Sequence, residues 1–389
     1  MANTPNVRFK GFVDEWEECK LSEVANLTSS RRVHADDYVE NGIPFYRGKE
    51  ISELREHKQV SEVLYITKEK YGELSKLYGS PVKGDLLITA VGTIGNTWVV
   101  DQLPFYFKDG NLIWFKDIKC SPKYLDYVLS TPNGQKKIMD SAIGSNQKAL
   151  TMVKLNELNF MFPESLEQEK IAIYFTNLDH LITLYQRKCD EVRQLKKFML
   201  QKMFPKSGEL IPEIRFVGFT DNWVQRKIKD IVPLQRGFDL PTSQMEDGIY
   251  PVVMSNGIGG KHSQYKVKGP GIVTGRSGTI GKLHYIEDDY WPHNTTLWVT
   301  DFNGNNQKFI YYMYQCLDLS RFSTGSGVPT LNRNDVHDEV VCIPSVGEQK
   351  KISEHLTNLD HLITLHQRKC DELKEVKRFM LQNMFPQKG

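Results

Sequence analysis

The sequence predicts an α/β fold in which two α/β domains are joined by two long antiparallel helices, as a pseudo-twofold internal repeat. The first observation is a duplicated segment, since TNLDHLITLYQRKCDE at residues 176–191 returns as TNLDHLITLHQRKCDE at 357–372. The second observation is an upstream duplication, in which residues 5–16 match residues 212–223. The sequence between these copies has diverged, so a constant frame surrounds two variable domains.

Each variable domain keeps a glycine turn that follows an apolar run. Residues 92–95 and 278–281 are both Gly-Thr-Ile-Gly, and apolar residues precede each turn. This order indicates a strand that ends in a turn. Nearer the end of each domain, residues 149–151 (Ala-Leu-Thr) match residues 330–332 (Thr-Leu-Asn). Short apolar runs broken by Gly, Asn and Pro predict a mixed α/β domain with many loops.

The downstream duplication predicts two long helices. Between residues 168–205 and 349–386, 26 of 38 positions are identical at a constant offset of 181. Apolar residues recur at alternating steps of four and three, which is the heptad pattern of a coiled coil. Each helix should end before Met-Phe-Pro, because proline cannot continue it. Matching apolar seams allow the helices to pair, and we expect an antiparallel pair through Ile171, Phe175, Leu178, Ile182, Tyr185, Cys189, Ile352, Leu356, Leu359, Ile363, His366 and Cys370.

The repeats also predict the domain boundaries. We expect a first variable domain with its repeated N-terminal segment at 1–163, a first spacer helix at 164–205, a second variable domain at 206–345, and a second spacer helix with the C-terminus at 346–389.

Composition is that of an ordinary globular protein. The 389 residues carry a net charge of +2, with 40% hydrophobic and 25% charged residues. Neither an apolar run of membrane-spanning length nor an export signal is evident, so we expect a cytoplasmic protein without a membrane partner. The six cysteines are widely spaced without a CxxC pair, which favours reduced thiols over a zinc site.

Motifs of catalysis are missing from the sequence. It contains neither a GxxxxGK[ST] phosphate loop nor the Asn/Asp-Pro-Pro-aromatic motif of amino methyltransferases. We therefore expect no catalytic residue, no metal site and no cofactor in this chain, and a binding function.

Polar and basic residues in the glycine-rich loops are candidates for DNA binding, because such side chains hydrogen-bond to phosphates and base edges. For any one of them a loop hydrogen bond or a solvated surface position is an alternative, and only their recurrence around the glycine turns favours binding. The candidates are Ser29, Ser30, Arg31, Arg32, Arg47, Lys49, Thr93, Asn96, Gln147, Lys148, Arg236, Ser255, Asn256, Lys261, Arg276, Ser277, Thr330, Asn332 and Arg333.

The whole arrangement resembles a specificity subunit of a type I restriction-modification system. The resemblance rests on the paired Arg-Phe-x-Gly-Phe-x-x-x-Trp segments, the two glycine turns, and Pro163…Glu167-Gln168 with Pro344…Glu348-Gln349 before the helices. It implies two target-recognition domains that each read half of a split double-stranded DNA sequence, with the helices fixing the gap. It further implies two modification subunits that use S-adenosylmethionine, and restriction subunits that use ATP and Mg²⁺.

Other functions stay open at this point. The chain could serve a modification-only methyltransferase complex, or be a coiled-coil scaffold without DNA readout. A nuclease or methyltransferase within the variable domains would predict that the chain alone modifies DNA.

Overall fold

The computed structural model describes residues 4–56, 58–144, 148–206, 208–324 and 329–386.

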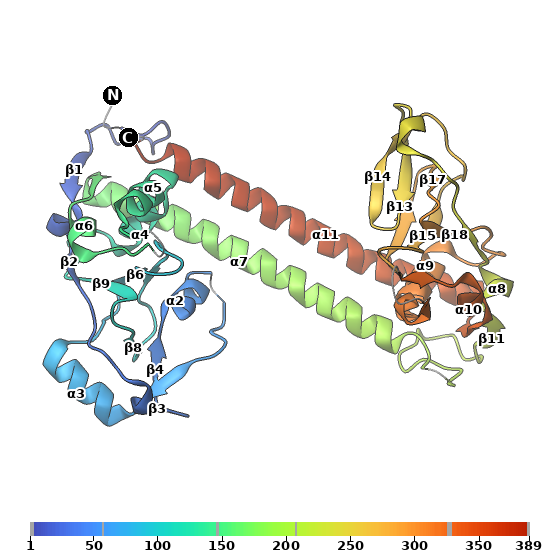
Figure 1. The fold of residues 1–389 in the computed structure, drawn as a ribbon, viewed down its shortest axis with the longest axis horizontal. Coiled ribbons are helices and arrows are strands. Elements are labelled where there is room, and N and C mark those ends of the chain that lie inside the picture. The colour runs from blue at the N-terminus through green and yellow to red at the C-terminus, as the bar shows by residue number, and fades with distance from the viewer. Residues whose placement is uncertain (1–3, 57, 145–147, 207, 325–328, 387–389) are drawn as a thin grey trace. The chain divides into compact units, whose positions relative to one another are not determined.

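The chain forms two compact units, residues 1–186 with 368–389 and residues 187–367. Helix α7 (Ser165–Lys202) and helix α11 (Val346–Asn383) each pass from one unit into the other. Each unit therefore contains the first half of one long helix and the second half of the other (Figure 1).

The first unit contains two four-stranded sheets and one short pair of strands. Its sheets have the strand orders β2-β9-β6-β7 and β3-β5-β4-β8, and β1 pairs with β10. The apolar strand β6 is wholly buried, which places it inside its sheet between β9 and β7. The strands are β1 (Glu17–Lys20), β2 (Asn26–Thr28), β3 (Tyr38–Val39), β4 (Ile43–Tyr46), β5 (Leu64–Ile66), β6 (Leu86–Thr89), β7 (Thr97–Val99), β8 (Tyr106–Phe107), β9 (Leu112–Lys116) and β10 (Asn159–Phe162).

Short helices cover these sheets. Ser121 caps helix α4, and a proline in the first turn fits a position whose N–H needs no partner. Helix α4 contacts α7 through the hydrogen bond from Tyr127 to Asp179, and Figure 1 shows α3 at the end of this unit away from the long helices. The helices are α1 (Leu21–Val24), η1 (Ala35–Asp37), α2 (Gly48–Arg55), α3 (Lys68–Tyr78), α4 (Pro122–Ser130), α5 (Pro132–Ser141) and α6 (Met152–Asn156).

The second unit has a corresponding four-stranded sheet and strand pair, but its other sheet is different. Its sheet β12-β18-β15-β16 corresponds to β2-β9-β6-β7, and β11 pairs with β21 as β1 does with β10. The second sheet is instead β14-β13-β17. The strands are β11 (Val224–Lys227), β12 (Leu234–Arg236), β13 (Tyr250–Met254), β14 (Gly257–His262), β15 (Gly271–Gly275), β16 (Leu283–Ile286), β17 (Trp291–Pro292), β18 (Thr296–Val299), β19 (Ser323–Thr324), β20 (Thr330–Leu331) and β21 (Val340–Ile343). The shorter helices are α8 (Ile228–Ile231), η2 (Thr242–Gln244), α9 (Gln307–Cys316), η3 (Leu319–Phe322) and α10 (Arg333–Asp338).

The long helices run antiparallel within each unit. In the first unit the Cys370 thiol donates to the carbonyl of Ile182, with Sγ and O 3.8 Å apart. In the second unit the Cys189 thiol donates to the carbonyl of Ile363 over 3.6 Å. The α/β fold class with two long antiparallel helices is confirmed.

The positions expected to pair the helices differ in burial. Ile171, Phe175 and Leu178 lie in the core of the first unit, where Met384 and Phe385 from the end of α11 also pack. The corresponding core of the second unit contains Ile352, Leu356 and Leu359 with Met203 and Phe204. Cys189 and Cys370 are fully buried, and the half-buried members are Ile182, Tyr185, Ile363 and His366.

The repeated N-terminal segments anchor each unit to its own long helix. Arg8 donates to both carboxylate oxygens of Glu167 over 2.8 and 2.7 Å, and Trp16 Nε1 donates to the same carboxylate over 3.2 Å. Arg215 makes the same two-bond contact with Glu348 over 2.7 and 2.8 Å. Both carboxylates are buried, and a buried charge needs such a partner.

The glutamine that follows each buried glutamate binds the N-terminal capping residue of a neighbouring short helix. Gln168 Oε1 accepts from the backbone N–H of Ser121, and Gln349 Oε1 accepts from that of Asn306, over 3.0 and 2.8 Å. Ser121 and Asn306 cap α4 and α9, so these two helices occupy corresponding places. The Glu-Gln motif is thereby explained as an internal anchor.

Among the described residues, no helix combines the length and apolar character needed to cross a lipid bilayer.

Candidate nucleic-acid interface

The glycine turn of the second unit is held by backbone contacts that only glycine allows. Gly281 N donates to Gly275 O over 3.1 Å, which closes the turn between β15 and β16. A Cβ on Gly275 would lie 1.8 Å from the carbonyl oxygen of Thr279. Gly278 and Gly281 have φ values of +80° and +72°, which residues other than glycine rarely adopt. The turn is therefore a fixed platform for the residues beside it.

The second repeated motif lies directly against this turn. Leu331 N donates to the carbonyl of Arg276 over 2.7 Å, and Ser277 forms a β-bridge with Thr330. In the first unit Leu150 N donates in the same way to the carbonyl of Ala90 over 2.8 Å. Two motifs far apart in sequence thus form one site in each unit.

In the second unit this site is a groove of about 440 Å³, which we call the arginine groove. The structure brings five of the candidates together in it. The groove is lined by Arg236, Arg276, Leu297, Thr324, Thr330, Leu331, Asn332, Arg333 and Asn334.

The three arginines of the groove differ in whether they form an ion pair with an acidic residue. Arg236 forms an ion pair with Asp239 at 3.0 Å. Within the described part of the chain, neither Arg276 nor Arg333 has an acidic ion-pair partner. Asn332 accepts from Asn334 N over 3.0 Å and caps helix α10, which positions Arg333 at the first turn of that helix. Two guanidinium groups therefore remain available for an anionic or base-edge ligand.

The corresponding site in the first unit carries neutral side chains. Leu150 and Leu331 make equivalent contacts, so Ala90 stands where the second unit has Arg276 and Met152 where it has Arg333. Thr28 pairs with Trp114 as Gln235 pairs with Trp298, so Ser29 corresponds to Arg236. The scaffold is the same and the side chains differ, as expected of two sites with different ligands.

Several DNA-binding candidates of the first unit form contacts with other residues of the same unit. Ser29 Oγ donates to Leu112 O over 3.3 Å, and Ser30 Oγ donates to Phe107 O over 2.7 Å. Arg31 lies over the Tyr78 ring, with its guanidinium carbon 4.6 Å from the ring centroid. Arg32 Nε is 3.4 Å from Asp109 and its side chain is 71% exposed. Arg31 and Arg32 are therefore the accessible cations of this loop.

The remaining candidates near the first glycine turn lie on helix α2 or contact it. Arg47 forms an ion pair with Glu50 at 2.5 Å, and this bond raises the pKa of Arg47. Lys49 forms an ion pair with Glu62 at 3.0 Å. Thr93 and Asn96 both contact Ser52, with Oγ1–Oγ and Nδ2–Oγ distances of 3.3 and 2.9 Å.

Two residues of this network were missed by sequence reasoning. Ser52 is one of them, and Arg55 is the other, since it reaches Ser130 Oγ over 3.1 Å and Thr97 Oγ1 over 3.3 Å. No motif marks either residue, because the described part of the second unit contains no helix that repeats α2.

The other candidates of the second unit are not among the residues that line the arginine groove. Ser255 N donates to Thr295 Oγ1 over 3.3 Å, and Asn256 O accepts from Lys282 Nζ over 2.7 Å. Lys261 is exposed on β14, and Ser277 is half-buried. Lys282 and Thr295 were not among the site candidates, and neither lies in a motif shared by both units. In the first unit Lys148 is exposed, while Gln147 lies outside the described residues.

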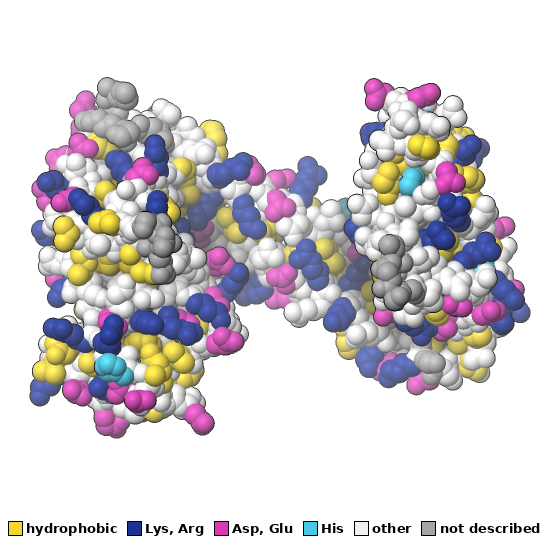
Figure 2. All heavy atoms as spheres, viewed as in Figure 1, with side chains coloured by type: hydrophobic (Ala, Val, Ile, Leu, Met, Phe, Trp, Pro, Cys, Tyr) yellow, Lys and Arg dark blue, Asp and Glu magenta, His cyan; other side chains and the backbone are white. Residues whose placement is uncertain are grey.

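Charge is spread over the surface of each unit. Figure 2 shows basic and acidic side chains interspersed on this face of both units. Among the described residues, no group of three His, Cys, Asp or Glu could hold a metal ion, and the six cysteines are free thiols.

A histidine connects two of the elements that carry the arginines of the groove. Leu234 N, at the start of β12, donates to His337 Nε2 over 2.8 Å, and His337 lies on α10. Burial lowers the pKa of His337, and the nearby Arg333 lowers it further. The neutral ring therefore ties together the two elements that carry Arg236 and Arg333.

Comparison with known proteins agrees with this duplicated architecture. Residues 13–194 and 220–375 both match the family model of the type I restriction modification DNA specificity domain. The chain is 20% identical to the type I restriction enzyme MjaVIII specificity subunit of Methanocaldococcus jannaschii, over 94% of this chain and 91% of that protein.

Solved structures show the same fold. An S subunit of a type I restriction-modification system from M. genitalium aligns with a TM-score of 0.71 at 15% identity, over 99% of this chain and 100% of that one. A chain from a type I restriction-modification system studied for complex assembly aligns with a TM-score of 0.54 at 13% identity, over 94% and 96%. With two family domains covering most of its length, the chain belongs to the family of type I restriction-modification specificity subunits.

Proposed function

We propose that each unit of this specificity subunit reads one half of a bipartite double-stranded DNA target. The observation that carries the proposal is the pair of equivalent sites, cationic in the second unit and neutral in the first. Arginine binds guanine with two hydrogen bonds in the major groove and also binds phosphates. Arg276 and Arg333 are suited to either contact, because both line the groove without an acidic ion-pair partner among the described residues.

The first unit would read a different half-site with different side chains. Its loop presents Arg31 and Arg32, and Lys148 lies exposed next to the bridge formed by Ala149. The hydroxyl groups and apolar side chains at its glycine turn favour contacts such as those to thymine methyl groups. Two half-sites of unlike sequence are therefore expected.

We further propose that the paired helices set the distance between the half-sites and dock two modification subunits. Support comes from apolar side chains that are exposed at the same places in both helix copies. These are Leu181 with Leu362, Leu195 with Val376, and Phe198 with Phe379. A surface present twice can hold two copies of one partner.

The chain itself would be non-catalytic in this scheme. The modification subunits would bind S-adenosylmethionine, and restriction subunits, where present, would bind ATP and Mg²⁺. A modification-only complex would need the same chain without the restriction subunits.

A helix insertion tests the spacing role. Seven residues inserted after both Gln186 and Gln367 keep the heptad pattern and lengthen each helix by about 10 Å at 1.5 Å per residue. The gap in the methylated motif should then grow by about three base pairs at 3.4 Å per pair, with both half-sites unchanged. An unchanged gap, or altered half-sites, would contradict the proposal.

A further inference from the structure

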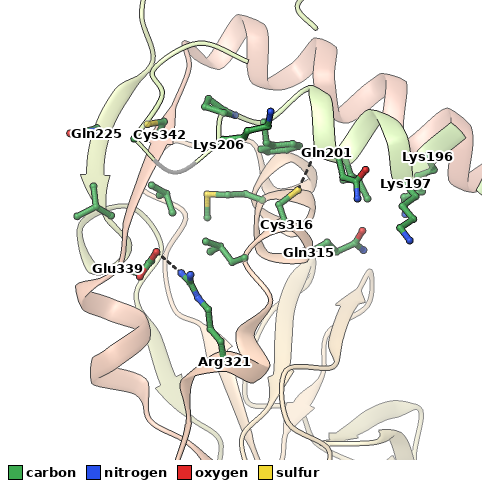
Figure 3. A pocket seen from close by; sticks show the side chains of 18 of the residues that line it. Lys196, Lys197, Gln201, Lys206, Gln225, Gln315, Cys316, Arg321, Glu339 and Cys342 are labelled. Atoms are coloured by element: carbon green, nitrogen blue, oxygen red, sulfur yellow. Dashed lines mark hydrogen bonds and ion pairs between the residues drawn. The ribbon is translucent and has the colours of Figure 1, made fainter. Parts of the chain in front are cut away.

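The second unit has an open groove beside the end of helix α7. It has a volume of about 690 Å³ and lies between α7, α9 and β21 (Figure 3). Cys316 lies in the middle of the labelled side chains, with Lys197, Lys206 and Arg321 around it. The apolar lining includes Leu200, Phe204, Met313, Leu317, Val340 and Val341.

The internal repeat shows what covers the same surface in the first unit. Helices α4 and α9 correspond, since Tyr127 donates to Asp179 over 2.9 Å and Tyr312 donates to Asp360 over 2.8 Å. Four residues further along, Thr131 therefore corresponds to Cys316. Thr131 caps helix α5, with its Oγ1 accepting from Gly134 N over 2.9 Å. Among the described residues of the second unit, no helix is capped by Cys316.

Helix α5 packs on the strand that corresponds to β21. Lys137 Nζ donates to the carbonyl of Asn159 over 3.1 Å and lies over the Phe160 ring at 5.5 Å. Ile138 is fully buried in the core of the first unit. At the offset of 181, Asn159 and Phe160 correspond to Val340 and Val341, which line the open groove.

The segment of the second unit that corresponds to α5 is shorter. Leu150 lies 23 positions after Tyr127, whereas Leu331 lies 19 positions after Tyr312. The four-residue helix η3 (Leu319–Phe322) follows α9 where the ten-residue α5 follows α4, and Leu319 and Ser320 lie against Gly281 as Gln135 lies against Gly95. As a result Val340 is 51% exposed beside the groove.

We propose that the open groove binds a short amphipathic helix from a partner polypeptide, in the place that α5 occupies in the first unit. The apolar face of that helix lies on Leu200, Met313 and Val340. Its flanks carry Asp or Glu, because the lining contains Arg193, Lys196, Lys197, Lys206 and Arg321 but, among described residues, the single acid Glu339.

Charge at the rim favours an acidic partner even though several cations are already paired. Arg193 pairs with Asp190, Lys196 with Asp360, Lys206 with Glu213 and Arg321 with Glu339. Lys197 has no ion-pair partner within the described part of the chain, and it is exposed. The corresponding surface of the first unit is closed by α5, so this contact holds one partner helix per chain. The proposed contact does not involve DNA, so it can be absent while the proposed function holds.

The test uses the full-length chain and a helical peptide as probe. The peptide has the α5 sequence of residues 132–141 with K136E and K137E, a hydrocarbon staple and a fluorescent label. Fluorescence anisotropy should show binding of one peptide per chain. Val340→Asp and Lys197→Glu, both at exposed positions, should each weaken binding at least tenfold, which corresponds to about 1.4 kcal/mol.

The repeat supplies matched controls. Asn159→Asp and Arg378→Glu alter the corresponding positions of the first unit, where α5 is in place, and should leave peptide affinity unchanged. Circular dichroism confirms that each variant is folded. Absence of binding, two peptides per chain, or equal losses in the controls would overturn the proposal. Displacement of the peptide by a random duplex DNA would assign the groove to nucleic acid and overturn it as well.

Discussion

Lys196 on helix α7 donates a hydrogen bond to Asp360 on helix α11, with Nζ and Oδ1 2.7 Å apart. Tyr312 donates to the other oxygen of the same carboxylate over 2.8 Å. In the first unit Lys377 and Tyr127 make the same contacts with Asp179. The aspartate of the repeated TNLDH segment thus joins both long helices to the neighbouring α4 or α9, which explains why it is present in both copies.

Removing this contact should loosen both units by similar amounts. Asp179→Asn and Asp360→Asn should each lower the free energy of unfolding of the affected unit by about 1–2 kcal/mol, since a hydrogen bond to a charged group is lost and the pair is partly solvated. Urea denaturation followed by circular dichroism measures the change. Arg368→Ala, which removes an exposed ion pair with Glu372, serves as the control and should cost less than about 0.5 kcal/mol. Equal effects of all three variants would show that the aspartates have no special role.

Loss of the N-terminal anchor should be more costly. Arg8→Ala leaves the fully buried Glu167 without its cation and should destabilise the first unit by about 3–5 kcal/mol. Arg8→Lys should rescue little, because lysine cannot form the two parallel bonds. Adding Glu167→Gln to Arg8→Ala should recover part of the loss in a double-mutant cycle monitored by urea denaturation. A purely additive cycle would mean that the two residues do not interact.

Acid should weaken the support of the arginine groove. The pKa of His337 is lowered in the folded state, mainly by burial, so the unfolded chain binds the proton more readily. The contribution of His337 is therefore complete above its unfolded pKa of about 6.5 and is lost as the pH falls below that value. His337→Gln should flatten the pH dependence of unfolding between about pH 5 and 7. His361→Gln, at an exposed position of α11, is the control. An unaltered pH profile in the His337 variant would exclude this residue.

The arginine groove should also set the salt dependence of DNA binding. If Arg276 and Arg333 contact phosphates, each alanine variant should reduce the slope of log affinity against log salt by about one. A contact to a base edge would instead cost about 1–3 kcal/mol of discrimination at one position with little change in slope. Lys268→Ala, at an exposed position outside the groove lining, is the control in binding assays on the assembled complex. Variants with neither change would remove both arginines from the interface.

Sequence reasoning succeeded where the chain is duplicated. The long helices, the glycine turns and the Glu-Gln motifs each occur twice, so comparison of the copies identified them without a structure. The contact between the glycine turn and the segment at Leu150 or Leu331 was not predicted, because backbone pairing between distant segments leaves no local signal.

The regions without a repeat were not predictable in the same way. Helix α2 in the first unit and strand β14 in the second occupy the sequence before each glycine turn. Thr93 and Asn96 have the polar character of DNA-binding residues, yet both bond to Ser52 on α2. Side-chain type shows which bonds a residue can form, and only the fold shows which partner it meets.

The most direct measurement is the DNA motif methylated by cells that express this chain with its modification subunits, determined by sequencing of modified bases. We expect a bipartite motif in which Arg276→Ala with Arg333→Ala relaxes or changes only the half-site of the second unit, while the gap and the other half-site stay the same. An unchanged motif, or simultaneous change of both half-sites, would contradict the assignment of one half-site to each unit.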